Sequence, residues 1–553
     1  MSPLMGVMQE TPLLISSFLR YAEDFHPDRL VVSRDYRGHE RVASYSLTAA
    51  RARRLAKALI GAGILAGDRV ATLAMNHHRH FELFYGVSGI GSVLHTVNPR
   101  LFDEQIVYIC NHAQSRILVF DPPFADLVGR LAPRLPKLER YIVLGDATEL
   151  ETVRHALPTA VPLIDYESFI AAQDDPFTWP SFDERCASSL CYTSGTTGNP
   201  KGVLYSHRST VLHALAACQN SAMGLSAHDV IMPLAPMYHA NAWSTPYLAP
   251  MLGANLVLPG PKLDGASLQR LIERHSVTFT VAVPTVFTTL LDYLASSGKR
   301  VDTLKKASIG GAAVPSAMID LLRDKFGCTV AQVWGMTELS PLGTIATTTP
   351  AVAALPPDRA RSYLYKQGRA QFGLELKLID AAGLPVPRDG VSPGALWVRG
   401  PWAARGYFND PETLLDDEGY FPTGDVGTLD AHGYLDITDR TKDVIKSGGE
   451  WISSVQLENV AYAHASVRFV AVIGVKHPLW DERPVMVIEP QAGANLSKDE
   501  MLGWLKPQIA KWCLPDDVVF IEKMPMTATG KIRKSALREL LAGQQPTSDE
   551  AVQ

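Results

Sequence analysis

The sequence lacks the features that mark a membrane protein, a disulfide scaffold or a nucleic-acid-binding protein. No apolar run is long enough to cross a bilayer, and the N-terminus has neither the basic nor the apolar region of a signal peptide. The six cysteines are scattered without a CxxC pair, which favours reduced thiols over disulfides or a zinc site. No block of Lys or Arg occurs and the formal net charge is −5, so no nucleic-acid partner is expected. We therefore expect a cytoplasmic protein without an integral membrane segment.

What the sequence does contain is a long alternation of helix-like and strand-like segments. At 553 residues the chain exceeds what one hydrophobic core usually serves, so at least two domains are expected. Residues 46–64 carry a helical apolar stripe that opens with Ser46 as the expected N-cap, and a strand is expected over 68–76. The alternation continues in the ranges 81–91, 92–99, 104–113, 116–121, 254–260, 267–284 and 305–315. This pattern predicts βαβ units and largely parallel sheets.

The pattern changes twice towards the C-terminus. From about residue 375 short strands separated by Gly and Asp turns indicate a β-rich subdomain, and after residue 440 a compact α+β pattern begins. Helices are predicted there over 453–465 and 497–512, each opening with a capping box, Ser453–Gln456 and Ser497–Glu500. The predicted fold is α/β, with a large N-terminal domain of residues 1–439 and a small α+β C-terminal domain of residues 440–553.

One loop is unusually rich in hydrogen-bond donors. Residues 193–202 read TSGTTGNPKG and lie between two strand-like segments, 187–192 and 202–207. Pro200 occupies the position before Lys201, so the loop is not a Walker A motif. Its glycines let backbone N–H groups approach an anion, its hydroxyls add donors and its lysine adds a charge, which favours a phosphate-binding loop. A solvated turn is the alternative.

Other segments carry side chains that suit a bound nucleotide. Glu338 is a hard oxygen ligand of the kind that Mg²⁺ prefers, and Thr337 beside it could donate to an α-phosphate. Asp425 could accept hydrogen bonds from both hydroxyls of a ribose. The small residues 310–313, GGAA, would leave room for a flat adenine ring. Each of these segments, taken alone, could equally be an ordinary turn.

Together the segments resemble the acyl-adenylate-forming superfamily, which contains acyl-CoA synthetases, firefly-luciferase-like enzymes and peptide-synthetase adenylation domains. Six motifs occur in the family's order over almost the whole chain: YTSGTTGNPKG (192–202), PMYHANAW (236–243), WGMTE (334–338), YFPTGD (420–425), DRTKDVIKSGGEWI (439–452) and PMTATGK (525–531). The resemblance implies an acid–thiol ligase that uses ATP, Mg²⁺ and coenzyme A. Such an enzyme would form an acyl-AMP, release pyrophosphate, and transfer the acyl group to coenzyme A.

The resemblance also implies the residues of the site. The catalytic groups would be Lys531, Arg440, Thr337 and Lys201. The nucleotide would be bound by Thr193, Ser194, Gly195, Thr196, Thr197, Gly198, Gly311, Ala312, Trp334, Gly335, Met336, Asp425 and Arg440. Mg²⁺ would be held by Glu338 and Thr196, and the acyl pocket would be lined by His239, Asn241 and Trp243. Lys531 follows a strand-like segment on a loop that could reach the cleft of another domain, where the family's lysine contacts the carboxylate and the α-phosphate.

In the family, the C-terminal domain rotates after the first step and presents another face to the same pocket. Lys442 matches the hinge position, where many relatives carry an acidic residue instead. The face for coenzyme A would include Lys446, Gly448, Gly449 and Trp451, whose glycines would let the pantetheine arm pass close to the backbone. The C-terminal domain is therefore expected to be mobile.

The nature of the acid is less constrained. Residues 236–243, here called the acyl segment, include no acidic residue to pair with a substrate ammonium. Residues 279–287 are apolar, so an aliphatic or small neutral acid is expected. One buried CH₂ contributes only about 0.8 kcal/mol, so steric depth must limit the chain length. We predict a medium-chain fatty acid as substrate. A 3-methylthiopropionate, short-acid or aryl-acid ligase, a luciferase-like oxygenase, a domain that loads a carrier protein and a non-enzymatic nucleotide sensor are the alternatives.

Two further expectations concern assembly and metal binding. Relatives of this type often form dimers, so a homodimer is one expected assembly. The run HHRH (77–80) could suggest a metal site, but such runs are mostly solvated helix starts, and that interpretation is preferred here.

Overall fold

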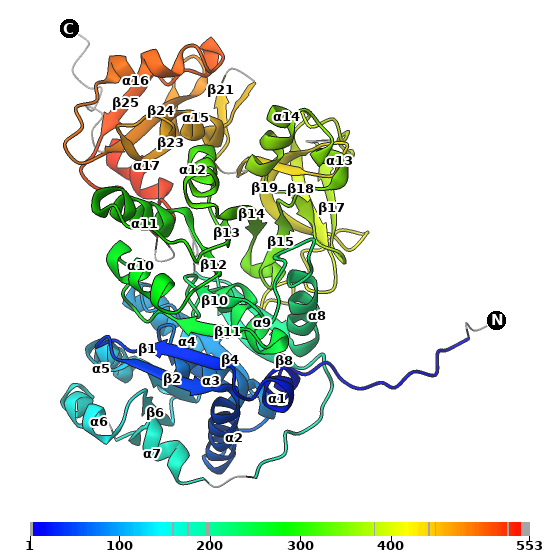
Figure 1. Ribbon diagram of the computed structural model, residues 1–553, viewed down its shortest axis with the longest axis vertical. Coiled ribbons are helices and arrows are strands. Elements are labelled where there is room, and N and C mark those ends of the chain that lie inside the picture. The colour runs from blue at the N-terminus through cyan, green and yellow to red at the C-terminus, as the bar shows by residue number, and fades with distance from the viewer. Residues whose placement is uncertain are drawn as a thin grey trace.

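The structure is a computed structural model that describes residues 4–157, 160–173, 176–193, 199–380, 382–440, 443–447, 450–527 and 530–542, without the side chains of residues 450, 451 and 542. It confirms the predicted α/β class, with parallel sheets in the large N-terminal part, a β-rich subdomain and a small α+β unit at the C-terminal end (Figure 1). In the described part of the chain, no helix combines the length and apolar character that a membrane span requires.

A seven-stranded sheet with the order β7-β6-β5-β3-β4-β8-β9 is parallel except for its last pair. Its strands are β3 (Arg69–Leu73), β4 (Val93–Thr96), β5 (Ile117–Phe120), β6 (Arg140–Val143), β7 (Leu163–Asp165), β8 (Ala187–Tyr192) and β9 (Gly202–Ser206). The helices that connect them include α3 (His78–Gly86), α4 (Asp103–His112), α5 (Ala125–Leu131), α6 (Ala147–Val153) and α7 (Tyr166–Ala171). The segments that flank the donor-rich loop are strands, as predicted, and the structure pairs them as the antiparallel hairpin of β8 and β9.

A nine-stranded sheet with the order β16-β15-β14-β13-β12-β10-β11-β1-β2 is parallel from β14 to β1 and antiparallel at both edges. Its strands are β1 (Leu30–Arg34), β2 (Glu40–Ser44), β10 (Val230–Pro233), β11 (Asn255–Leu258), β12 (Phe279–Ala282), β13 (Lys306–Gly310), β14 (Thr329–Gly335), β15 (Leu342–Ile345) and β16 (Arg369–Ala370). Its helices include α8 (His207–Ala217), α9 (Thr245–Leu252), α10 (Gly265–Arg274), α11 (Pro284–Ser297) and α12 (Ser316–Phe326).

The main core lies where the two sheets face each other. It combines residues of both sheets with α1 (Ser16–Phe25), α2 (Tyr45–Gly61), α3 and α9. Val70 and Leu94 come from one sheet, and Leu256 and Val281 from the other. Because burial of apolar surface is the dominant favourable term in folding, this shared core fixes the two sheets against each other and brings their strand ends together.

The β-rich subdomain is an antiparallel sheet of β17 (Glu375–Ile379), β18 (Gly394–Arg399), β19 (Phe421–Leu429) and β20 (Leu435–Arg440), preceded by α13 (Pro350–Ala353) and α14 (Pro357–Ser362). The C-terminal unit contains β21 (Ile445–Ser447), β22 (Glu450–Ile452), β23 (Val467–His477), β24 (Asp481–Pro490) and β25 (Asp517–Phe520) with α15 (Ser454–Tyr462), α16 (Lys498–Leu505) and α17 (Lys534–Ala542). This unit lies over α11 and α12 (Figure 1), and a hydrogen bond of 3.0 Å joins Thr288 Oγ1 to the hydroxyl of Tyr462.

Local details differ from the sequence expectations in three places. Helix α2 is capped by Ser44, whose hydroxyl accepts from the N–H of Leu47, and Ser46 lies inside the helix. Helix α16 ends at Leu505, well before residue 512, because Pro507 has no backbone N–H with which to continue the helical hydrogen bonds. The HHRH run does begin a helix, but its histidines are buried and not solvated. The predicted caps Ser453 and Ser497 are confirmed.

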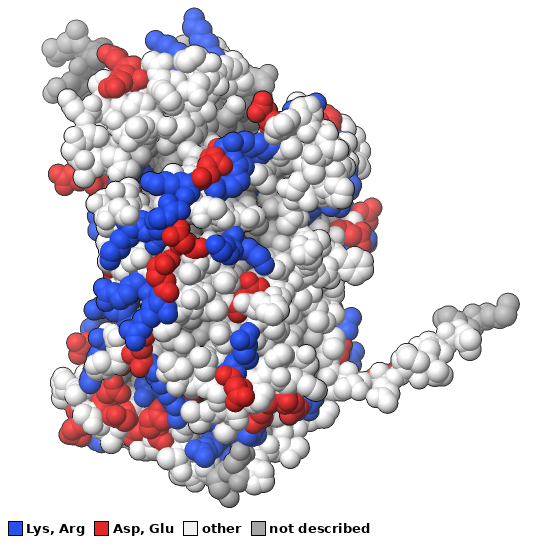
Figure 2. Space-filling view, viewed as in Figure 1, with Lys and Arg blue, Asp and Glu red and all other residues white. Residues whose placement is uncertain are grey.

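Lys and Arg side chains lie among Asp and Glu side chains on the face shown in Figure 2. Ion pairs at α12 and α14 include Arg323–Asp320 at 3.2 Å and Arg361–Asp324 at 3.0 Å. The charge of these two helices is therefore mixed and not uniformly basic.

Candidate active site

The base of the donor-rich loop is formed by Thr193 and Lys201, next to the pair of Tyr192 and Gly202 that ends the β8–β9 hairpin. The N–H of Thr193 donates to the carbonyl of Lys201 at 2.9 Å, and the N–H of Lys201 donates to Oγ1 of Thr193 at 3.2 Å. Lys201 places its ammonium 4.6 Å from the ring centroid of Tyr407, a cation–π contact. The predicted nucleotide ligands Ser194, Gly195, Thr196, Thr197 and Gly198 lie outside the described residues.

Tyr407 links this loop to the predicted magnesium ligand. Its hydroxyl donates to Oε1 of the buried Glu338 at 2.7 Å. Burial raises the pKa of Glu338, while the Tyr407 hydrogen bond and the charge of Arg440 oppose that rise. Thr337, also buried, accepts a 2.6 Å hydrogen bond from the Tyr205 hydroxyl on its carbonyl oxygen. Sequence reasoning missed Tyr407, and the only local signal was an aromatic residue in the turn-rich segment 406–410.

The predicted ribose ligand is held from both sides. Asp425 is buried on β19, and its Oδ2 accepts from the indole N–H of Trp334 at 2.7 Å. Its Oδ1 lies 3.2 Å from Nε of Arg440, which stands opposite it in the register of β19 and β20. The carboxylate is therefore oriented by two donors from different strands. Gly335 and Met336 continue β14 beyond Trp334 into the turn that ends at Glu338.

Lys531 reaches this group from the C-terminal unit. Its loop is docked on α11, where the Thr285 hydroxyl donates to the carbonyl of Gly530 at 2.8 Å. Burial and the positive charge of Arg440 lower the pKa of Lys531 to about 8, against the opposing carboxylates of Asp425 and Glu338. The structure thus brings the predicted lysine, arginine and two carboxylates into electrostatic contact, although they lie on three separate parts of the chain.

Gly311 lies beside the lysine side chain. A Cβ at this position would be 3.4 Å from Cε of Lys531 and 3.6 Å from Cζ2 of Trp243. The backbone of Gly311 has φ +78°, a conformation that L side chains rarely adopt. The nearest atom to such a Cβ is Cγ1 of Val283 at 3.3 Å, so the positive φ and this close neighbour both favour glycine here, and Ala312 follows it in the sequence.

The acyl segment leads into a backbone conformation that its sequence does not predict. Five consecutive residues without a glycine, from Ala240 to Ser244, have φ between +44° and +64°. A left-handed conformation costs roughly 1–2 kcal/mol per residue, so surrounding contacts must hold it. Asn241 is anchored by a 2.9 Å hydrogen bond to Oγ of Ser189, and Oγ of Ser244 lies 2.8 Å from Nδ1 of the buried His213.

His239 stands just before this left-handed turn. Burial and the charge of Lys531 lower its pKa to about 3, so the imidazole is neutral at pH 7. The described residues contain no group of three or more His, Cys, Asp or Glu side chains that could hold a metal ion. The role of His239 as a residue of the acyl-pocket wall stays a prediction.

Two residues of the predicted coenzyme A face, Lys446 and Trp451, lie in a hairpin of the C-terminal unit. Lys446 is exposed on β21, where its N–H donates to Oε2 of Glu482 at 3.0 Å, and it pairs in register with Trp451 of β22. This hairpin lies on the side of the C-terminal unit away from α17 (Figure 1). The predicted hinge Lys442 and the glycines Gly448 and Gly449 lie outside the described residues.

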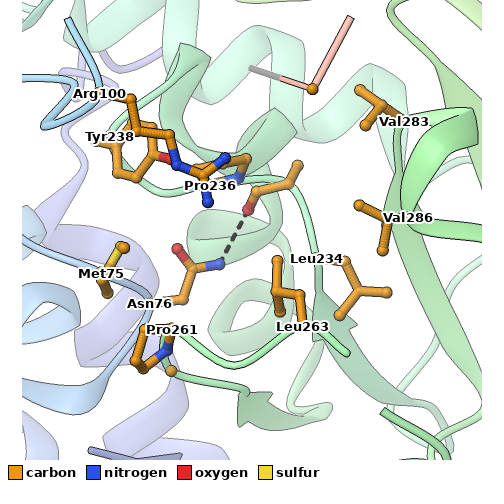
Figure 3. Close-up of a pocket in the computed structure, with 13 residues that line it drawn as sticks. Met75, Asn76, Arg100, Leu234, Pro236, Tyr238, Pro261, Leu263, Val283 and Val286 are labelled. Atoms are coloured by element: carbon orange, nitrogen blue, oxygen red, sulfur yellow. Dashed lines mark hydrogen bonds between the residues drawn. The ribbon is translucent and has the colours of Figure 1, made fainter. Parts of the chain in front are cut away.

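A largely apolar cavity lies next to the Lys531 loop. Val283 and Val286 face Met75 and Asn76 across it (Figure 3). The cavity is lined by Met75, Asn76, Arg100, Leu234, Ala235, Pro236, Tyr238, Gly260, Pro261, Leu263, Val283, Val286 and Gly530. Arg100 is exposed; burial raises the pKa of the Tyr238 hydroxyl, and the charge of Arg100 opposes that rise. Sequence reasoning did not single out Asn76, Arg100 or Tyr238.

Comparisons with known proteins show the family and the fold of the chain. The model of the AMP-binding enzyme family matches residues 19–408, and that of the AMP-binding enzyme C-terminal domain matches residues 456–531. The chain is 48% identical to the 3-methylmercaptopropionyl-CoA ligase of Ruegeria pomeroyi, over 97% of this chain and 98% of that protein. It is 44% identical to the medium-chain-fatty-acid–CoA ligase of Ectopseudomonas oleovorans, over 97% of each. The crystal structure of the anthranilate CoA ligase AuaEII, 23% identical, shares the fold with a TM-score of 0.84 over 97% of this chain and 100% of that chain.

Proposed function

Because the chain belongs to the AMP-binding enzymes, as an acyl-CoA ligase that uses ATP and coenzyme A, we propose that its acid is an unbranched one with an uncharged tail. A medium-chain fatty acid is the substrate that we favour. The observation that carries this proposal is that Lys531 lies beside Gly311, as Trp243 of the acyl segment does, and is buried where the charges of Asp425 and Glu338 act on its ammonium. A cation at that point would face both the acid and the nucleotide.

In the first step, the carboxylate of the acid attacks the α-phosphorus of ATP and pyrophosphate leaves. Both reactants are anionic, so the site must supply positive charge where negative charge gathers. Lys531 would contact the carboxylate and the α-phosphate, and Arg440 and Lys201 would face the phosphates. Asp425 would accept from the ribose hydroxyls, and Gly311 and Ala312 would leave room for the adenine.

Mg²⁺ fits this site as part of the nucleotide complex. The ion keeps several waters and takes one or two carboxylates together with phosphate oxygens. Glu338 supplies a carboxylate beside the base of the donor-rich loop, held there by Tyr407. Residues 338 and 196 would hold the ion, which would neutralise the developing charge on the phosphates.

In the second step, the thiol of coenzyme A attacks the acyl carbon of the acyl-AMP and AMP leaves. We propose that residues 440–553 rotate as a unit, turning about Lys442. This motion would withdraw Gly530 and Lys531 and present Lys446, Gly448, Gly449 and Trp451. The apolar cavity beside Gly530 would then accept the pantetheine arm, with Arg100 near a phosphate of coenzyme A. A cytoplasmic location and a homodimeric assembly stay predictions.

Two observations bear on the acid. The acyl segment carries Trp243 and a neutral His239, and Val283 lies with Trp243 around Gly311, which suits an uncharged tail. A relative at 44% identity is named as a medium-chain-fatty-acid ligase, which supports the favoured substrate. A relative at 48% identity is named as a 3-methylmercaptopropionyl-CoA ligase, which makes that thioether acid the second candidate.

A matched pair of acids separates the two candidates. 3-Methylmercaptopropionate and pentanoate differ only by sulfur in place of one CH₂, and octanoate extends the chain. We expect coenzyme A-dependent AMP production with a higher kcat/KM for octanoate than for either shorter acid. A preference for the thioether acid over both pentanoate and octanoate would establish the second candidate instead. Absence of AMP with every acid, at saturating Mg²⁺ and ATP, would refute the ligase proposal.

A further inference from the structure

The side chain of Asn76 connects the two sheets at the start of the acyl segment. Asn76 lies in the loop between β3 and α3 and is 5% exposed. Its Nδ2 donates to the carbonyls of Pro233, at 3.0 Å, and Ala235, at 2.9 Å. Its Oδ1 accepts from the N–H of Met237 at 2.7 Å. The bond to Ala235 is the dashed line in Figure 3.

These partners use the amide in only one orientation. Two of them are carbonyl oxygens, which can only accept, and the third is a backbone N–H, which can only donate. A flipped amide would face two acceptors with its oxygen and one donor with its NH₂ group. The three hydrogen bonds therefore require an asparagine amide in this orientation. All three partners lie within residues 233–237, which begin at the end of β10 in the other sheet.

The loop that carries Asn76 is itself tied to its own sheet. Asp121, directly after β5, accepts from the N–H of Met75 at 2.8 Å and lies 2.6 Å from Nε2 of His77. The carbonyl of Asn76 also accepts from the N–H of Gly260, which follows β11, at 2.9 Å. Because its flanking residues are anchored, Asn76 cannot follow a shift of the opposite sheet without breaking hydrogen bonds.

The segment that Asn76 holds leads straight into the proposed acyl site. Met237 is two residues before His239, and the left-handed turn that carries Trp243 begins at Ala240. We propose that Asn76 is a positioning residue for the acid: its amide sets the place of residues 233–237 and thereby the shape of the site that His239 and Trp243 line. The inference rests on the proposed function of the acyl segment and adds a residue that does not touch the acid.

Two variants and a matched control test this role. Asn76→Asp keeps the volume and the acceptor for Met237 but turns an oxygen towards two carbonyls, and Asn76→Ala removes all three bonds. Ser33→Ala is the control. Ser33 is also buried, and its Oγ accepts from the N–H of His78, at the start of α3, at 2.9 Å. Within the described residues, its side-chain hydrogen bonds go to His78 and not to residues 233–237. Each variant is measured for Tm and for acid-dependent ATP–pyrophosphate exchange.

We expect both Asn76 variants to raise KM for the acid about tenfold and to change the octanoate-to-pentanoate ratio of kcat/KM by about threefold or more, with KM for ATP nearly unchanged. Ser33→Ala should lower Tm without changing either acid parameter. If the Asn76 variants lower Tm and leave KM for the acid and the ratio at wild-type values, Asn76 is merely structural and the inference is overturned. Should Asn76→Asp fail to fold, Asn76→Ala decides between the same two outcomes. If none of the acids supports ATP–pyrophosphate exchange by the wild-type protein, the proposed function and this inference are overturned together.

Discussion

The indole N–H of Trp334 donates to Oδ2 of Asp425 at 2.7 Å, joining the end of β14 to the middle of β19. Arg440 occupies the other carboxylate oxygen at 3.2 Å, so the two donors fix the plane of the carboxylate. A carboxylate held in this way is pre-oriented for a ligand, which lowers the cost of binding.

Trp334→Phe should therefore raise KM for ATP by about tenfold, because a hydrogen bond to a charged group contributes about 1.5–3 kcal/mol. The measurement is ATP–pyrophosphate exchange at saturating acid. Trp402→Phe is a matched control, since its buried indole donates to the carbonyl of Leu342 at 3.3 Å instead of to a site residue. Equal effects of the two substitutions would mean that the bond to Asp425 has no special role.

Lys531→Ala should slow acyl-AMP formation by about a hundredfold or more, because the positive charge facing the transferred group is lost. Thioester formation from supplied acyl-AMP should be retained, since the lysine is proposed to leave the site before that step. Lys523→Ala, at an exposed lysine on the same part of the chain, serves as the control. Equal loss of both half-reactions in Lys531→Ala would contradict the assigned role.

The rate of the first step should fall in alkaline solution. With a pKa of about 8, Lys531 is protonated below that pH and loses its charge as the pH rises through it. We expect kcat/KM for pyrophosphate exchange to fall about tenfold per pH unit above that point in the free enzyme. In Lys531→Arg the guanidinium stays protonated, so the alkaline decline should move beyond the measured range. A decline that persists unchanged in this variant would assign it to another group.

Tyr407→Phe should lower the activity of the enzyme at acidic pH. The Tyr407 hydrogen bond opposes the effect of burial on Glu338, so its loss should raise the pKa of that carboxyl further. The acidic limb of the pH–rate profile should then move to higher pH, and the Mg²⁺ concentration for half-maximal rate should rise. Tyr420→Phe is the control. It removes a comparable hydrogen bond in the β-rich subdomain, from the Tyr420 hydroxyl to Oε2 of Glu375 at 3.0 Å, and should change neither quantity. A profile like that of wild type in Tyr407→Phe would remove this residue from the site.

Much of the fold could be predicted because it depends on local patterns. The apolar periodicity of residues 46–64 produces α2, and the strand-like segments on either side of the donor-rich loop form β8 and β9. The error at the α2 cap arose because Ser44 and Ser46 are equally good caps by type, and only the preceding strand decides between them. The HHRH run was expected to be solvated because histidine is polar, yet His77 pairs with Asp121 and His80 packs inside, with burial lowering its pKa to about 3.

The candidate site was predictable in its parts, since Lys531, Arg440, Asp425 and Glu338 each lie in a motif, but their roles stay predictions. Tyr407 and Asn76 carried no motif, and their importance comes from partners far along the chain. The left-handed turn from Ala240 to Ser244 was invisible for another reason: without glycine, its local preference is for another conformation, and packing overrides it.

The sequence by itself determined most of the secondary structure, the order of the motifs and the chemistry that each could perform, because these depend mainly on neighbouring residues and on side-chain type. Only the tertiary structure decided which residues meet: 201 with 407, 334 with 425, 76 with 237, and 531 with the carboxylates of 338 and 425. Such meetings follow from the burial of a core shared by two sheets and from the docking of the C-terminal unit on α11. They are long-range consequences of packing, which no window of consecutive residues contains.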